Sequence, residues 1–159
     1  MIQVSCYNTT QELIIKTCCQ LVEKCYYGKL NTCIILHNND FLQELDKVLW
    51  TYSQKKFIPH ATEHDPLQNK QPVYLTTSVN NPNQATAFLL INPTKETILT
   101  LLLDNNQNND IQKILILNDG SQLIDLTEIS NIISQSDFKS VELNHFEQTG
   151  NGNWQKRIL

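Results

Sequence analysis

The sequence predicts a single α/β domain with a Rossmann-like, three-layer fold and a mostly parallel central sheet. Strand, helix, strand and helix patterns follow one another over residues 2–50, and this order favours a parallel sheet covered by helices. The continuous apolar run within residues 32–37 is typical of an interior strand buried on both faces. The chain has 159 residues, of which 40% are hydrophobic, so we expect one domain with a substantial core over residues 1–159.

A change in hydrophobic periodicity marks the first strand and the first helix. The strand is indicated by alternate apolar residues: Ile2, Val4 and Cys6. Thr9 or Thr10 is expected to cap the helix that follows, and Gly28 is expected to end it. The apolar face of this helix is predicted from residues at helical spacing: Ile14, Cys18, Leu21, Val22 and Cys25.

A second amphipathic helix is predicted to end at Trp50. Its apolar positions recur at helical spacing: Phe41, Leu45, Val48 and Leu49. One of three consecutive polar residues is expected to cap its start: Asn38, Asn39 or Asp40. Residues 57–60 predict a brief strand at a sheet edge, because Pro59 lacks a backbone donor. Trp50 and Phe57 beside such an edge are typical of a protein-binding surface, and packing into the core is the alternative.

The second half of the chain alternates apolar strands with polar turns. Strands are expected over residues 72–76, 87–92 and 114–117. Residues 96–103 predict a helix, with a strand as the alternative, and an asparagine-rich loop is expected over residues 104–110. A further helix is expected from about residue 122 to residue 134. Alternation over residues 141–145 and the turn at residues 150–152 predict a C-terminal β-hairpin that returns over residues 154–158.

Composition excludes several classes of function. The net charge of -4 and the pI of about 5.5 argue against a broad phosphate-binding surface, so we expect contact with DNA to be indirect. The five cysteines form no CxxC pair, and their odd number favours reduced, buried thiols in the cytoplasm. No apolar run approaches the roughly 20 residues that a membrane span needs, so no membrane contact is expected.

The sequence lacks the common catalytic motifs, so we expect no cofactor and no enzyme activity of the chain by itself. The strand-to-helix turns lack the glycines of a dinucleotide or P-loop site, and no GxSxG motif is present. Metal-like spacing occurs at His60 and His64, and a small metal-dependent α/β enzyme is therefore the alternative hypothesis. Pro59 and Pro66 leave little room for a helix there, so we expect no metal. Cys6 is the one plausible nucleophile, and core packing is favoured for it.

One stretch carries a family resemblance. LDKVLW at residues 45–50, followed closely by FIPH at residues 57–60, resembles the chi subunit of the bacterial DNA polymerase III holoenzyme. Pro72-Val73 and Asn81-Pro82-Asn83 support the resemblance, which covers the chain from residue 2 to about residue 92 and weakly the rest. The resemblance implies an accessory, non-catalytic subunit that joins the clamp loader to the single-stranded-DNA-binding protein during DNA replication.

The resemblance also implies two binding surfaces. The surface for a psi-like clamp-loader subunit would be formed by the tryptophan and the residues of the second motif: Trp50, Phe57, Ile58 and Pro59. The acidic C-terminal tail of the single-stranded-DNA-binding protein would bind between the first and last helices, where the family carries basic residues. This sequence departs from that pattern, because residues 114–138 contain no basic residue. The remaining lysines and an apolar seat are the candidates for the tail: Lys16, Lys24, Lys139, Ile129 and Ile133. The alternative for Lys16 and Lys24 on the first helix is that they are ordinary surface residues exposed to solvent, with no binding role.

Overall fold

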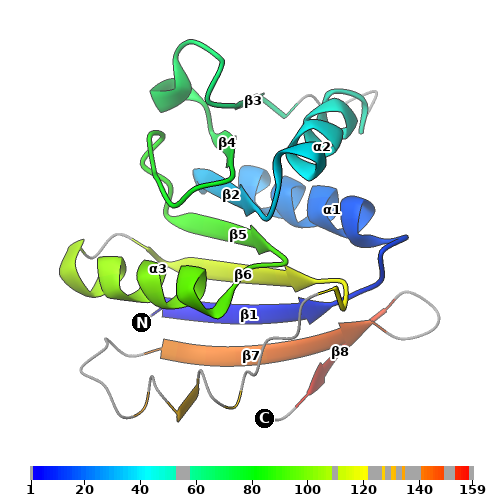
Figure 1. Ribbon diagram of the computed structural model, residues 1–159, viewed down its shortest axis with the longest axis vertical. Coiled ribbons are helices and arrows are strands. Elements are labelled where there is room, and N and C mark those ends of the chain that lie inside the picture. Colours follow the sequence, from blue (N-terminus) through cyan, green and yellow to red (C-terminus); the bar gives the residue numbers. More distant parts are fainter. Residues whose placement is uncertain are drawn as a thin grey trace.

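The computed structural model describes residues 2–52, 58–108, 111–121, 127, 130–131, 134, 141–148 and 153–157. These residues form a mixed α/β fold around one sheet with the strand order β3-β4-β2-β5-β6-β1-β7-β8 (Figure 1). The strands are β1 (Ile2–Asn8), β2 (Thr32–Leu36), β3 (His60–Ala61), β4 (Val73–Thr76), β5 (Ala87–Ile91), β6 (Lys113–Asn118), β7 (Val141–Gln148) and β8 (Trp154–Arg157). The helices are α1 (Ile14–Tyr27), α2 (Asn39–Thr51), α3 (Lys95–Asn108) and the short 3-10 helix η1 (Gln68–Lys70).

The strands are parallel except for the last pair. Only β7 and β8 run antiparallel, which confirms the predicted C-terminal hairpin. Helices α1 and α2 cover one face of the sheet, and α3 covers the other (Figure 1). Strand β2 is buried along its whole length, with Ile34 and Leu36 packed toward α1 and α2 and with Cys33 and Ile35 on the face of α3. The predicted three-layer α/β fold is confirmed.

The start of α1 differs from the prediction. The helix begins at Ile14, and its N-cap residue, Leu13, makes no side-chain capping bond. Thr9 does not cap because its hydroxyl donates instead to the Oε1 atom of Gln148, 3.0 Å away on β7. Thr10 takes part in a turn, in which its carbonyl accepts from the amide of Leu13. The predicted apolar face of α1 and its end at Gly28 are confirmed.

The ends of α2 and α3 follow from local bonding. Asn38 caps α2 by accepting a hydrogen bond of 2.8 Å from the amide of Phe41. The prediction of a loop over residues 104–110 is wrong in its first part, because α3 continues to Asn108. Ile98, Leu101 and Leu102 anchor that helix in the core, and asparagine in a helix costs only about 0.7 kcal/mol or less per residue relative to alanine. The predicted helix near residues 122–134 lies mostly outside the described residues.

The predicted strand at residues 57–60 is shorter than expected. Strand β3 begins at His60, pairs with β4 and contains two residues. Pro59 has no amide hydrogen for a sheet bond, and the carbonyl of Ile58 accepts from the His60 ring. The strand therefore starts only after both residues. Phe57 lies outside the described residues.

The asparagine motif after β4 has a structural role. The buried Asn83 amide donates to the carbonyls of Thr32, at 3.2 Å, and Gln71, at 3.1 Å. Asn81 accepts from the amide of Ala85 at 2.6 Å and donates to the carbonyl of the same residue at 3.1 Å. The two side chains thus hold the loop against the start of β2 and the segment before β4.

Candidate protein-binding sites

The imidazole of His60 joins the last turns of α2 to the edge strand β3. Its Nδ1 atom lies 2.9 Å from the carbonyl oxygen of Ile58, and its Nε2 atom lies 3.0 Å from Oδ1 of Asp46 on α2. The ring centroid lies 4.7 Å from that of Trp50, with the two planes tilted by 52°. Asp46 and Trp50 are one helical turn apart, so both reach the ring from the same side of α2.

The two nitrogens of His60 both face acceptors. A carbonyl oxygen can only accept, so the contact with Ile58 places a hydrogen on Nδ1. The Nε2 atom faces Oδ1 of Asp46 at 3.0 Å, a contact whose geometry does not make it a hydrogen bond. The buried ring therefore lies among a backbone carbonyl, a carboxylate and the indole of Trp50.

The residues expected to bind a psi-like subunit lie in different environments. Trp50 is 54% exposed, which is unusual for so large an apolar side chain. Pro59 is partly buried. Ile58 is only 2% exposed and packs in the core beneath α1 and α2, so the expectation that it lies on the surface is wrong. The sequence pattern does not say whether Ile58 faces outward or inward, because that depends on how it packs against distant parts of the chain.

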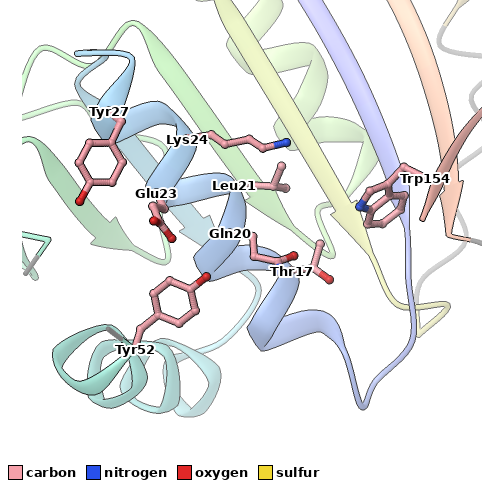
Figure 2. A pocket seen from close by; sticks show the side chains of 8 residues that line it. All are labelled: Thr17, Gln20, Leu21, Glu23, Lys24, Tyr27, Tyr52 and Trp154. Atoms are coloured by element: carbon pink, nitrogen blue, oxygen red, sulfur yellow. The ribbon is translucent and has the colours of Figure 1, made fainter. Parts of the chain in front are cut away.

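A second surface lies along the exposed side of α1. A groove of about 680 Å³ runs between this helix, the end of α2 and the hairpin strand β8 (Figure 2). It is lined by Thr17, Gln20, Leu21, Glu23, Lys24, Tyr27, Tyr52 and Trp154. Figure 2 shows the Lys24 side chain extending from α1 toward the indole of Trp154. On the other side of α1, burial and the nearby charge of Glu23 raise the pKa of Tyr52. Lys24 is the basic residue among those that line the groove, and its side chain extends toward β8.

Trp154 belongs to an aromatic cluster that sequence analysis missed. Tyr7 of β1 stacks on Phe146 of β7, with ring centroids 5.0 Å apart and planes 13° apart. Trp154 meets the same tyrosine edge-on at 5.2 Å and 84°. The pairing of β8 with β7 brings the indole to α1. The only sequence signal was an aromatic residue at the return of a predicted hairpin.

The residues predicted for tail binding are only partly brought together. Lys24 lines the groove, whereas Lys16 is exposed on the same helix and does not line it. Lys139, Ile129 and Ile133 lie outside the described residues. The groove adds an aromatic wall to the set, from Tyr27 and Trp154.

The alternative metal site is not assembled. His60 and His64 do not share a helix, because residues 60–61 form a strand and residues 63–64 a turn. The His60 side chain is fully buried, whereas that of His64 is 85% exposed and lies 3.5 Å from Glu63. Within the described residues, no three His, Cys, Asp or Glu side chains gather as ligands of one ion would.

The cysteines are core residues. Burial raises the pKa of Cys6, and likewise of Cys19 and Cys33, to about 12, which disfavours the thiolate that a nucleophile requires. His145 of β7 pairs with Cys6 of β1, but its Nε2 atom lies 2.9 Å from the side-chain Nδ2 atom of Asn8. None of the helices in the described part of the chain has the length and apolarity that a membrane span requires.

Together, the fold and these surfaces define a small α/β fold with an exposed tryptophan at the end of α2 and an aromatic groove that runs along α1 to β8. The family model for "DNA polymerase III chi subunit, HolC" matches residues 1–113. A relative from Rickettsia prowazekii (strain Madrid E), named "Probable DNA polymerase III subunit chi", is 35% identical over 156 residues, which are 98% of this chain and 92% of the relative. The chain therefore belongs to the DNA polymerase III chi subunit family.

Family membership confirms the prediction of an accessory subunit of DNA polymerase III that serves DNA replication. The family match contains α2, β3 and hence the contacts among Asp46, Trp50 and His60. It ends at the first residue of β6, so Trp154 of the groove lies beyond it. The relative matches almost the whole chain.

Proposed function

We propose that this chain is a non-catalytic bridge between the clamp loader and the single-stranded-DNA-binding protein, working as one domain in the cytoplasm. The observation that carries the proposal is the exposure of Trp50, at 54%, at the end of a helix and against a buried histidine. Aromatic anchors dominate the binding energy of many protein interfaces. A bridge also needs two separate surfaces, and the groove along α1 supplies a second candidate.

The clamp-loader side of the bridge would be centred on Trp50. The indole and the partly buried Pro59 would contact a psi-like subunit, with Phe57 as a third contact. Ile58 would support this surface from beneath, because it is packed in the core. Binding would remove the exposed part of the indole from water, and truncation of such an anchor typically costs about 2 kcal/mol or more of binding free energy.

The tail side of the bridge would use the groove along α1. An acidic tail offers carboxylates that Lys24 can hold, and apolar tail residues would pack against Leu21 and Trp154. Lys16 and Lys139, with Ile129 and Ile133, remain candidates for additional contacts. The net charge of -4 makes contact with DNA through the single-stranded-DNA-binding protein more favourable than direct contact.

Binding of the purified clamp-loader complex of the same cell tests the first surface. We expect Trp50→Ala to weaken this binding by about 30-fold, which corresponds to the roughly 2 kcal/mol of a truncated anchor. Leu103→Ala is the matched control, because Leu103 is 49% exposed but lies on α3, across the sheet from α2. Equal affinities for the wild type and Trp50→Ala would contradict the proposal.

Calorimetric titration with the C-terminal peptide of the same cell's single-stranded-DNA-binding protein tests the second surface. We expect binding that weakens as salt is raised and that falls with Lys24→Ala more than with Lys16→Ala, because only Lys24 lines the groove. Absence of binding at low salt would remove the tail from the proposal and leave the clamp-loader surface standing.

A further inference from the structure

We propose that His60 and Asp46 are positioning residues that hold the Trp50 indole in one orientation for its partner. This inference rests on the proposed role of Trp50 in binding the clamp loader. It adds that affinity depends on a pair of polar residues that lie behind the indole and are not themselves the exposed contact surface.

Trp50 lies in the last turns of α2, and more than half of its surface is open, so core packing alone does not fix its rotamer. The His60 ring lies against it at 4.7 Å between centroids. That ring is itself fixed, because its side chain is fully buried and each nitrogen meets an acceptor on a different segment, Ile58 before β3 and Asp46 on α2. The indole therefore rests on a support that cannot rotate freely.

The Asp46 carboxylate contacts the same ring that supports the indole. Its Oδ1 atom is 3.0 Å from Nε2 of His60, and the His60 ring in turn contacts Trp50. Asp46 is 33% exposed, so it is reached by solvent while the histidine is not. Replacing this carboxylate changes the support of Trp50 without removing any side chain from the core.

A fixed orientation of Trp50 should increase its affinity for a partner. A side chain that is ordered before binding loses less conformational freedom when the complex forms. Immobilising one large side chain costs about 0.5–1.5 kcal/mol, which corresponds to a factor of about 2 to 13 in affinity. We therefore expect Asp46→Asn to weaken clamp-loader binding by about 3- to 10-fold, less than Trp50→Ala does.

The experiment combines a partner-free measurement with a double-mutant cycle. In ¹⁹F NMR of protein labelled with 5-fluorotryptophan, the two tryptophans give two signals, which Trp154→Phe assigns. Asp46→Asn should shift and broaden the Trp50 signal and leave that of Trp154 unchanged. Glu44→Gln, on the exposed side of the same helix, makes the same change in net charge and should change neither signal.

The cycle separates positioning from a general loss of structure. In the Trp50→Ala background, Asp46→Asn should have no further effect on clamp-loader affinity, since its effect passes through the indole. A loss that persists in this background would overturn the inference, and so would a wild-type Trp50 signal in Asp46→Asn. His60→Phe, which keeps a ring but no nitrogens, should reproduce both effects of Asp46→Asn. If Trp50→Ala itself leaves affinity unchanged, the proposed function fails, and the Trp50 signal alone then decides whether Asp46 positions the indole.

Discussion

The indole of Trp50 covers the imidazole of His60, with 4.7 Å between ring centroids, and the two side chains differ sharply in burial. The tryptophan is 54% exposed, whereas the histidine side chain is wholly inside. We expect His60→Ala to lower the free energy of unfolding by about 2 kcal/mol, because it empties a buried site and removes the contacts of the ring with Ile58 and Asp46. Trp50→Ala should cost about 1 kcal/mol or less. Urea unfolding measures both, and a larger loss for Trp50→Ala would contradict the assignment of the tryptophan to a surface.

Asn83→Ala should destabilise the fold through the loop that follows β4. The amide of Asn83 serves two carbonyls, and its loss leaves buried acceptors with fewer donors. We expect a decrease of about 1–3 kcal/mol in the free energy of unfolding. Asn80→Ala is the control, because Asn80 is exposed and it is its backbone carbonyl, which the substitution keeps, that accepts from Cys33. Equal stability of the two variants in urea would contradict the structural role of the motif.

The buried thiols predict a loss of stability at alkaline pH. The pKa of Cys6 is raised to about 12 in the folded protein, whereas a thiol in an unfolded chain ionises near 8.5. The unfolded state therefore loses its proton first, so this contribution is complete below about pH 8.5 and declines as the pH rises toward 12. Each such thiol contributes a slope of up to about 1.4 kcal/mol per pH unit.

Cys6→Ala isolates one of these slopes. Its free energy of unfolding, followed from pH 8 to 11, should fall less steeply than that of the wild type by roughly 1 kcal/mol per pH unit. The variant loses some stability at neutral pH through the missing sulfur, and this loss should shrink as the pH rises. Parallel curves over this range would show that Cys6 is already ionised or exposed in the folded state.

Removal of the N-cap of α2 should lower the stability of the protein by a small amount. Asn38→Ala removes the acceptor for the Phe41 amide, and loss of such a cap typically costs about 1 kcal/mol. Asn39→Ala, at the exposed first residue of the helix, should change stability by less than about 0.5 kcal/mol. Thermal unfolding of the two variants distinguishes them. A larger loss of stability for Asn39→Ala than for Asn38→Ala would contradict the assignment of Asn38 as the N-cap.

Periodicity predicted the architecture where local pattern and burial agree. The apolar run of β2 indicated a strand buried on both faces, and β2 lies inside the sheet between β4 and β5. The alternation in β1 likewise matches its buried Ile2, Val4 and Cys6. The predicted start of α1 was wrong because the Thr9 hydroxyl donates a hydrogen bond to the side chain of Gln148, a residue 139 positions away. A contact of this kind has no signature in the neighbouring sequence.

The parts of the candidate sites that depend on neighbouring residues could be predicted from the sequence, and the parts that depend on distant contacts could not. The LDKVLW segment pointed to Trp50, and its exposure follows from its place on α2 opposite the buried Leu45 and Leu49. The burial of Ile58 could not be predicted, since it depends on packing between α1, α2 and the sheet. The groove was missed because Trp154 reaches α1 only through the pairing of the hairpin with β1.

The position of β1 in the sheet constrains the order in which the protein can fold. This strand ends at Asn8, yet its neighbours β6 and β7 begin only at Lys113 and Val141. Strands β2, β4 and β5 pair with one another within residues 32–91, so a partial sheet can form while the chain is still being synthesised. Closing so long a loop is slow compared with forming local contacts. Strand β1 therefore leaves the ribosome long before its partners do, and its unpaired edges need protection from aggregation in the nascent chain until β6 and β7 are available.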